Sequence, residues 1–398
     1  MTVDARRDSI ARALADDDGI LRLQPAWVAR DLVPPGRRLG LPEDAYDLGP
    51  RGGICERWLA STTEADNQTG PDGEGLSWIM LDGTDRIALR DAVLVDPVAI
   101  MGADYAATHD GLGRLAKIFD YGTRLPLHLH QRAEHAALVG RRPKDEAYYF
   151  PPGVEMGPHP ESFLGLHPSM AESGNHDLLL PYLESWDSDL ILQHSVAYLQ
   201  VSEHGFHVPS GVLHAPGSAL TIELQEDSDV FAMLQALNAG RIISKELLWK
   251  DVRVEDREQS GERFILDLVD WEENADPHFY ENHRLAPILI EESRQDGGQE
   301  WWIFYNTTKF SGKKLVVRPG CSYTSTDAGV YNILVWSGSG TYGGQPVEGG
   351  APELDELLIT HNRAVRGIEV RNTGQTDLVV IKFFGADVNP TVPMIDRR

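Results

Sequence analysis

The stretch Gly122-Thr-Arg-Leu-Pro-Leu-His128-Leu-His130-Gln-Arg-Ala-Glu134 is where two histidines alternate with leucines. Alternation of this kind is the period of a β-strand, so His128 and His130 are expected to share one strand face while the leucines take the other. Two imidazoles on one face of an apolar strand need polar partners once they are buried. A divalent metal is such a partner, and the stretch therefore indicates a metal site on a β-strand.

Two later segments supply further ligands of suitable chemistry. Lys144-Asp-Glu146-Ala-Tyr-Tyr places Lys144, Glu146 and Tyr148 on one strand face, and Val208-Pro-Ser-Gly-Val-Leu-His214 ends on a third histidine. Imidazole nitrogens with one carboxylate oxygen suit zinc first, and also manganese, iron, nickel or cobalt, with room left for substrate oxygens. A single His-x-His motif is weak evidence, so the prediction depends on the whole ordered set. We predict one divalent metal ion on His128, His130, Glu146 and His214.

The alternative for any single histidine is an ordinary core or surface role. The chain has 14 histidines. Besides His361, we expect that ordinary role for nine of them: His109, His135, His159, His167, His176, His194, His204, His278 and His283.

The composition describes a globular chain with enough apolar residues for two domains, since 41% of its 398 residues are hydrophobic. A formal charge of -25 argues against nucleic acid and against membranes as partners, because both require basic patches. Two cysteines, Cys55 and Cys321, make no disulfide framework, which favours a reducing compartment. No apolar run reaches membrane-spanning length and the N-terminus lacks the apolar core of a signal peptide, so we expect a cytoplasmic protein. The oligomeric state is not predicted.

Many glycines and prolines spread along the chain are typical of short strands joined by tight turns. We expect a helix over residues 1–20, a metal-binding strand-rich domain over 21–240 with a helical insertion at about 176–185, an acidic, partly helical connector over 241–292 and a second strand-rich domain over 293–398. The two strand-rich regions look like loose copies of one barrel unit. The second has Cys321-Ser-Tyr-Thr-Ser-Thr-Asp327 in place of His-x-His, so we expect it to bind no metal and to contribute packing.

The motifs resemble those of a known family. Gly122, His128, His130 and Glu134, followed by Gly140, are similar to the first signature of the cupin superfamily. A wider set of segments, over roughly residues 50 to 235, resembles type I mannose-6-phosphate isomerases. The segments are Glu56-Arg-Trp-Leu-Ala-Ser61, Gly113-Arg-Leu-Ala-Lys-Ile-Phe-Asp120, Lys144-Asp-Glu146, Phe163-Leu-Gly-Leu166, Phe206-His-Val-Pro-Ser-Gly-Val-Leu-His-Ala215 and Leu220-Thr-Ile-Glu-Leu-Gln-Glu-Asp-Ser-Asp229. The resemblance implies a mainly all-β fold, a double β-barrel of the cupin or jelly-roll type.

The same resemblance implies a metal-dependent aldose–ketose isomerase acting on a mannose-type sugar or sugar phosphate. That reaction moves a proton between C1 and C2 through an enediol, and it needs a Lewis acid and an acid/base pair. Lys144 is then expected as the acid or electrostatic stabiliser, and Glu134 as a base or as a partner of a ligand histidine. Their alternatives are an ordinary surface lysine and a solvated loop carboxylate.

Two departures from the family bear on the substrate. The family's first metal ligand is usually glutamine where this chain has His128, and the family's arginine after Ser-Asp is missing from Val230-Phe-Ala-Met233. A phosphate group needs a cationic clamp or a helix N-terminus. The candidates for substrate binding are Arg132, Arg141 and Arg142, whose alternative is a solvated turn, so the phosphate is left open.

Two other classes of protein fit the same ligand set. One is a metal-dependent cupin of different chemistry, such as a dioxygenase or a lyase, and the other is a non-catalytic sugar-binding double barrel. An isomerase exchanges the C2 hydrogen of its sugar with solvent, whereas a dioxygenase consumes oxygen only with Fe(II). A binding protein does neither, but its ligand stabilises it.

Overall fold

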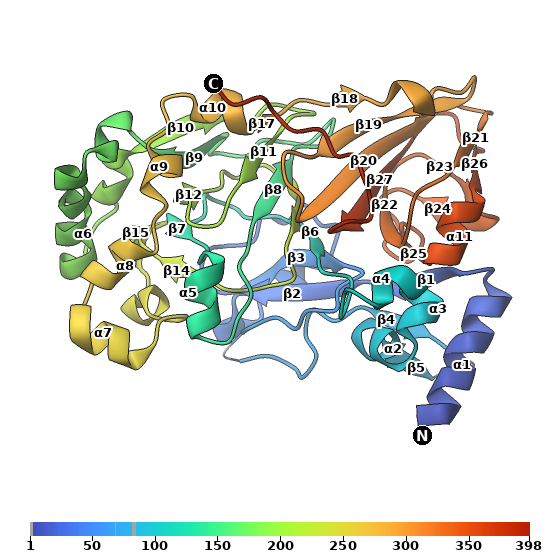
Figure 1. The fold of residues 1–398 in the computed structure, drawn as a ribbon, viewed down its shortest axis with the longest axis horizontal. Helices are drawn as coiled ribbons and strands as arrows, with labels where there is room; N and C mark the ends of the chain where they lie inside the picture. The colour runs from blue at the N-terminus through green and yellow to red at the C-terminus, as the bar shows by residue number, and fades with distance from the viewer. Residues whose placement is uncertain (1–2, 68, 82–84) are drawn as a thin grey trace. The chain divides into compact units, whose positions relative to one another are not determined.

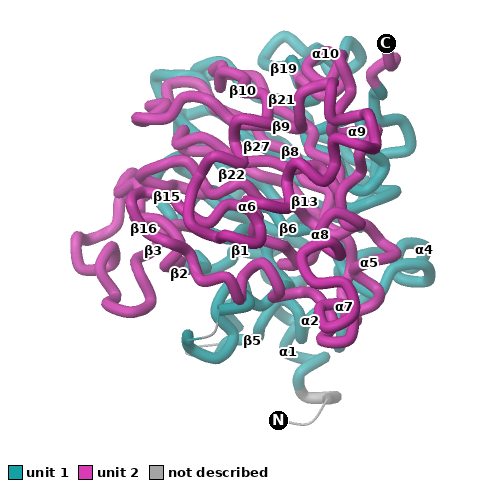
Figure 2. The backbone as a smooth tube through the Cα atoms, turned by 90° about the vertical axis from the view of Figure 1, so that its left-hand side faces the viewer, with its two compact units in different colours: residues 1–28, 57–118, 286–394 teal, residues 29–56, 119–285, 395–398 magenta. Residues whose placement is uncertain are grey.

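The computed structural model describes residues 3–67, 69–81 and 85–398. Two compact units divide the chain, and each draws on separate segments (Figure 2). Unit 1 contains residues 1–28, 57–118 and 286–394, and unit 2 contains residues 29–56, 119–285 and 395–398. Three of the unit boundaries fall within strands: β2 (Ala26–Arg30), β3 (Gly53–Leu59) and β6 (Leu115–Phe119). The boundaries predicted from the sequence run consecutively along the chain and stay a prediction.

Unit 2 is built on antiparallel strands (Figure 1). One five-stranded sheet has the order β10 (Ser195–Leu199), β9 (Glu161–Leu166), β12 (His214–Ala215), β7 (His128–Leu129), β14 (Ala232–Met233). Four neighbours in a second sheet are β17 (Arg284–Leu285), β11 (Gly205–Val208), β8 (Glu146–Tyr149) and β13 (Thr221–Gln225). A ribbon pairs β15 (Leu237–Asn238) with β16 (Arg241–Ile242). Every residue of β8 and β13 is buried, so polar side chains on these strands lie inside the unit.

The helical insertion predicted at about residues 176–185 is present in unit 2. It consists of the 3-10 turns η3 (Pro168–Ala171), η4 (Ser173–Leu179) and η5 (Leu190–His194) around α6 (Leu180–Ser185). Helix α6 ends where Trp186 takes a left-handed backbone conformation with φ of 49°. The Trp186 indole donates a hydrogen bond to the Ile243 carbonyl at 2.7 Å, and Leu179 and Leu183 are fully buried beside it. The insertion is therefore part of the unit's core.

The acidic segment after β16 is partly helical, as its pattern predicts. It contains η6 (Lys245–Leu248), α7 (Val254–Ser260), α8 (Arg263–Asp267), α9 (Trp271–Asn274) and α10 (Phe279–His283). All five belong to unit 2, and α6, α7 and α8 gather at the left-hand side of Figure 1. Ile265, Leu266 and Leu268 pack into the same hydrophobic core as β7 and β14.

Unit 1 holds the second set of strands. Its nine-stranded sheet has the order β18 (Ile288–Leu289), β19 (Gly298–Phe304), β20 (Phe310–Val317), β27 (Leu378–Gly385), β22 (Tyr331–Ser337), β25 (Glu356–Ile359), β1 (Ile20–Gln24), β4 (Trp78–Met80), β5 (Arg86–Ala88). A four-stranded sheet follows the order β21 (Ser322–Ser325), β26 (Ile368–Asn372), β23 (Ser339–Tyr342), β24 (Gln345–Glu348). The other helices of unit 1 are α1 (Val3–Asp16), α2 (Leu89–Val95), α3 (Pro97–Met101), α4 (Ala103–Ala106) and α11 (His361–Arg366), with the 3-10 turn η7 (Glu291–Ser293). Unit 2 also has the 3-10 turns η1 (Glu43–Tyr46) and η2 (Gly49–Arg51).

The prediction of a mainly β chain with a small helical insertion is confirmed, and the strand pairs within the sheets described are antiparallel. Within the described ranges, the structure has no helix with both the length and the apolar character needed to span a lipid bilayer.

Candidate metal centre

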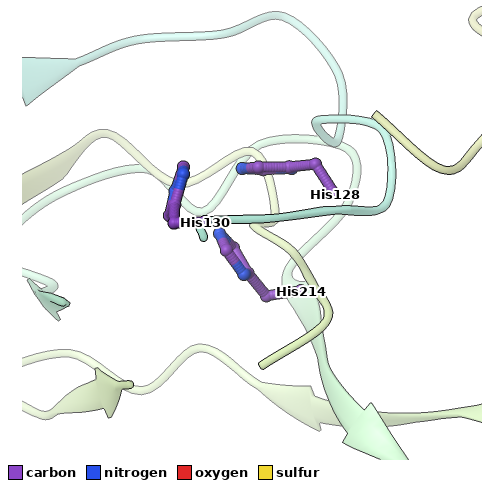
Figure 3. Close-up of side chains that lie close together, drawn as sticks. All are labelled: His128, His130 and His214. Atoms are coloured by element: carbon purple, nitrogen blue, oxygen red, sulfur yellow. The ribbon is translucent and has the colours of Figure 1, made fainter. Parts of the chain in front are cut away.

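Sheet pairing brings three histidines of unit 2 together. His214 of β12 lies directly opposite His128 of β7, and His130 follows β7 by one residue. All three are buried, and one nitrogen of each ring lies within 4.8 Å of the other two (Figure 3). The rings turn their nitrogen atoms toward one another in Figure 3, so they surround a common point.

Backbone carbonyls fix the tautomer of each ring. Nδ1 of His128 lies 2.7 Å from the Pro126 oxygen, and Nδ1 of His130 lies 2.7 Å from the Val230 oxygen. Nδ1 of His214 lies 2.9 Å from the oxygen of Val212, two residues earlier in the chain. A carbonyl oxygen only accepts, so each Nδ1 carries the hydrogen. Each Nε2 of a neutral ring is then left with a lone pair, which is the arrangement of a metal-binding histidine.

Burial favours the neutral form of His128 and His130. It lowers the pKa of His130 to about 3, with the neighbouring Lys144 adding to the effect. Burial also holds the pKa of His128 well below its usual range, and the adjacent His214 acts in the same direction. Neutral imidazole is the form that binds a metal ion.

Glu146 of β8 faces the bare nitrogens. Its Oε1 lies 3.0 Å from His214 Nε2, and its Oε2 lies 3.0 Å from His130 Nε2. Burial alone would raise the pKa of Glu146, but the Lys144 ammonium leads the interactions that hold this pKa well below the usual range. A carboxylate and two lone pairs this close repel one another, and the Lys144 ammonium beside Glu146 Oε2 and His130 Nε2 offsets this repulsion on that side only. Within the part of the chain that the structure describes, the buried His214 Nε2 also has no hydrogen-bond partner.

The residues present therefore fit a divalent cation. Three imidazoles and one carboxylate form a donor set that zinc, manganese, iron, nickel and cobalt accept. The structure brings together all four residues that the sequence analysis selected as ligands. Their assignment as ligands stays a proposal.

Lys144 is buried against this group. Its Nζ lies 3.0 Å from Glu146 Oε2 and 3.1 Å from His130 Nε2. The same ammonium lies 3.7 Å from Oε1 of Glu223, a buried residue of β13. A lysine in this position can donate hydrogen bonds to a ligand carboxylate and to a bound molecule.

The structure does not bring Glu134 to the histidines. Glu134 lies in the first turn of α5 (Ala133–Leu138), and its side chain is 59% exposed. Its contacts are with Arg132 at 3.2 Å and with His135 at 3.9 Å.

Each of the three arginines considered for substrate binding lies beside a carboxylate. Arg132 is 3.7 Å from Asp270 as well as 3.2 Å from Glu134. The Arg141–Asp251 distance is 3.9 Å, and the Arg142–Asp227 distance is 3.2 Å. Arg141 and Arg142 are about half exposed. Their role in substrate binding stays a prediction.

Sequence reasoning missed two buried partners of the group. The Tyr148 phenol donates a hydrogen bond to Glu146 Oε1, and Phe119 packs edge-on against the Tyr148 ring at 5.8 Å between centroids. The alternation of residues in this strand already placed Tyr148 on the same face as Glu146, so the sequence indicated that these two side chains could meet. Glu223 lies in one of the segments that resemble the isomerase family, but its position next to Lys144 depends on the pairing of β13 with β8, which places it opposite Tyr148.

A second, partly buried ionic network is connected to the histidine group through the backbone. Arg30 Nε lies 3.0 Å from Glu56 Oε1, and its Nη2 lies 3.5 Å from Asp229. The Tyr121 phenol donates a hydrogen bond to the same Glu56 oxygen. Asp229 directly precedes Val230, the residue whose carbonyl holds His130. No sequence spacing indicates this network, since 199 residues separate Arg30 from Asp229.

In unit 1, the segment that replaces His-x-His carries an ion-pair network. Asp327 lies 2.7 Å from Lys313 Nζ and 2.8 Å from Lys382 Nζ, and all three are buried. Glu300 pairs with Lys382 as well, and Ser325 Oγ lies 2.6 Å from that ammonium. His361 lies elsewhere in the unit, at the start of α11.

Among known proteins, only solved structures match this chain, and they establish its fold. No protein-family model and no curated protein sequence matches the chain. Three solved structures have a similar fold, and each match covers 92% of this chain. A mannose 6-phosphate isomerase from Bacillus subtilis matches with 15% identity, 99% of its own chain covered and a TM-score of 0.62, and a putative mannosephosphate isomerase from Archaeoglobus fulgidus matches with 12% identity, 97% of its chain covered and a TM-score of 0.61. A mannose 6-phosphate isomerase with zinc bound matches with 10% identity, 100% of its chain covered and a TM-score of 0.60. Identities this low establish the fold alone. The chain has the cupin-type, mannose-6-phosphate isomerase-like fold that its motifs predict.

Proposed function

We propose that the protein is a metal-dependent aldose–ketose isomerase that acts on mannose-type sugars. The observation that carries the proposal is the group of three buried imidazoles, two of which lie 3.0 Å from the Glu146 carboxylate, with the Lys144 ammonium in contact with that carboxylate and with His130. The isomerase names of the similar structures, one of them with zinc bound, support this reaction class.

His128, His130, Glu146 and His214 would hold the metal, with zinc first. Once bound, a zinc ion acts as a Lewis acid on the carbonyl and hydroxyl oxygens of a sugar. The backbone carbonyls of Pro126, Val230 and Val212 keep the three rings in the orientation and tautomer that this role requires.

Lys144 and Glu223 are the groups proposed to manage protons and charge at the substrate. The Lys144 ammonium holds a proton beside the ligand set and can donate it to a substrate oxygen. Glu223 is the buried carboxylate next to Lys144 outside the ligand set, whereas Glu134 is largely exposed. We therefore place the base that moves a proton between C1 and C2 at Glu223 rather than at Glu134.

Elemental analysis of the purified protein, followed by a panel of aldoses and aldose phosphates assayed for ketose formation, tests the proposal. We expect about one equivalent of a divalent metal and ketose formation from a mannose-type sugar. Oxygen consumption that requires Fe(II) would show that the protein is a dioxygenase and not an isomerase. A fully metallated protein that is stabilised by a sugar without converting it would be a binding protein.

A further inference from the structure

Backbone carbonyls at two different distances along the chain hold the three histidine rings. His128 and His214 each donate from Nδ1 to a carbonyl two residues earlier. His130 donates at 2.7 Å to the carbonyl of Val230, which lies 100 residues later in the chain. The orientation of the His130 ring therefore depends on the position of a distant segment, whereas the other two rings are oriented by their own segments.

The carbonyl that holds His130 belongs to a peptide group whose other end is bound by a carboxylate. The carbonyl of Val230 and the amide of Phe231 form one planar peptide group. The Asp251 carboxylate accepts a hydrogen bond from that Phe231 amide at 3.0 Å. One peptide group thus joins two hydrogen bonds, since its oxygen accepts from the His130 ring and its nitrogen donates to Asp251.

The preceding peptide group is held by the neighbouring side chain. The Lys250 ammonium donates to the Asp229 carbonyl at 3.1 Å and lies 4.3 Å from the centre of the Phe231 ring. Lys250 and Asp251 are consecutive residues, so one short segment binds two successive peptide groups on either side of Val230. Val230 itself is fully buried.

The segment that carries Asp251 is anchored in the core of unit 2. Leu248 and Trp249, which precede it, pack in the same hydrophobic core as β7 and β14. The Asp251 carbonyl accepts from the Gln131 side-chain amide at 3.4 Å, and Gln131 is fully buried directly after His130. Asp251 therefore contacts both chain segments that meet at the His130 ring.

The simpler interpretation of Asp251 is an ion pair near the surface. Arg141 Nε and Lys250 Nζ lie 3.9 Å and 3.8 Å from its carboxylate oxygens. The Asp251 side chain is only 5% exposed, however, whereas that of Arg141 is 44% exposed. The Phe231 amide is nearer to the carboxylate than either cation. The geometry therefore favours the peptide group as the main partner of this carboxylate over the two cations.

We propose that Asp251 is a positioning residue of the metal site, acting on His130 through the peptide group between Val230 and Phe231. Hydrogen bonds in a chain polarise one another, so a carboxylate at the amide end makes the carbonyl oxygen a better acceptor. A better acceptor at Nδ1 fixes the His130 ring and makes its Nε2 a stronger electron donor to a metal. This role rests on the proposed ligand set and adds to it a residue outside the four ligands.

Two substitutions at this position separate the acceptor oxygen from the charge. Asp251→Asn keeps an oxygen that can accept from the Phe231 amide but removes the charge, and Asp251→Ala removes both. We expect the zinc dissociation constant of the full-length protein to rise about tenfold for Asp251→Ala and about threefold for Asp251→Asn, on the scale of other outer partners of metal ligands. Competition with a chelator measures these constants. The ligand-field absorption of the cobalt(II)-loaded protein reports the ligand geometry, and we expect it to change in Asp251→Ala.

Asp96→Ala is the matched control. Asp96 also accepts from a backbone amide, that of Ala99 at 3.1 Å, but it does so at the start of α3 in unit 1. This variant should keep the zinc affinity and the cobalt spectrum of the unaltered protein. If both Asp251 variants keep them too, the inference is overturned, while the metal site and the isomerase function stand. An unaltered protein that binds neither zinc nor cobalt would overturn the metal site, and the inference with it.

The comparison between the two Asp251 variants tests the proposed path. Equal losses of zinc affinity would show that the charge acts without the peptide hydrogen bond, and would contradict the inference. Where Asp251→Ala does not fold, Asp251→Asn decides, because it preserves the shape of the side chain. A zinc dissociation constant unchanged in Asp251→Asn would then count against the role of Asp251.

Discussion

The phenol of Tyr148 donates a hydrogen bond to the carboxylate of Glu146, two residues earlier on the same strand face. On the other oxygen of that carboxylate lies the Lys144 ammonium, at 3.0 Å. Glu146 is thus held from both sides by side chains of its own segment. Such partners orient a metal ligand and tune its basicity.

Tyr148→Phe keeps the ring packed against Phe119 but removes the phenol hydrogen bond. We expect the zinc dissociation constant to rise about tenfold or more, since outer partners of metal ligands contribute on that scale. Competition with a chromogenic chelator measures it. Tyr149→Phe, on the opposite strand face, is the matched control. The same affinity in both variants would show that the phenol does not support the ligand.

His128→Ala removes one of four proposed ligands, so we expect the purified protein to lose most of its bound metal. His361→Ala alters a histidine of unit 1 outside the group and should retain the full metal content. Elemental analysis of both variants decides the point. Equal losses would mean that the metal site is assigned wrongly.

Glu223→Gln keeps the shape of the side chain next to Lys144 but removes its ability to accept a proton. We expect kcat to fall at least about a hundredfold with the metal content unchanged, as for the loss of a general base. Glu134→Gln, at an exposed position, should change kcat by less than about twofold, because surface substitutions have small effects. A larger loss in Glu134→Gln than in Glu223→Gln would return the base to Glu134.

Acid should weaken unit 1 through Asp327. Burial alone would raise the pKa of Asp327, but Lys382 and Lys313 outweigh it and lower this pKa from 3.8 to about 2. The folded-state pKa is depressed, so the pair stabilises the fold above pH 3.8 and this stabilisation is lost as the pH falls from 3.8 toward 2.

The double variant Asp327→Asn with Lys382→Met replaces this ion pair without leaving a buried charge alone. We expect its free energy of unfolding to decrease less steeply between pH 3.8 and pH 2 than that of the unaltered protein. Urea unfolding at a series of pH values measures the slope. Identical slopes would show that Asp327 does not control stability in this range.

Local patterns predicted the strands and the ligand candidates because both depend on neighbours in sequence. The alternation around His128 and His130 and the spacing of Lys144, Glu146 and Tyr148 are properties of single strands. The order of the motifs along the chain added His214, and the resemblance to a known family added the cupin-type fold.

What the sequence did not predict depends on pairing between distant segments. The approach of Glu223 to Lys144 follows from the register of β13 against β8, and the contact of Arg30 with Asp229 joins residues far apart in the chain. The interleaving of the two units has the same origin, since residues 57–118 associate with 286–394 rather than with their chain neighbours. The exposure of a side chain likewise depends on the fold, so the sequence did not predict that Glu134 is exposed and Glu223 is buried.

Solvent deuterium incorporation at C2 of mannose tests the central claim most directly. The zinc-loaded protein is incubated with mannose in deuterium oxide, and the C2 hydrogen of the recovered sugars is followed by proton NMR. The account predicts that deuterium enters C2 as ketose forms, and that neither occurs after chelation of the metal. Absence of both deuterium incorporation and ketose from the fully metallated protein, with mannose and with mannose 6-phosphate alike, would contradict it.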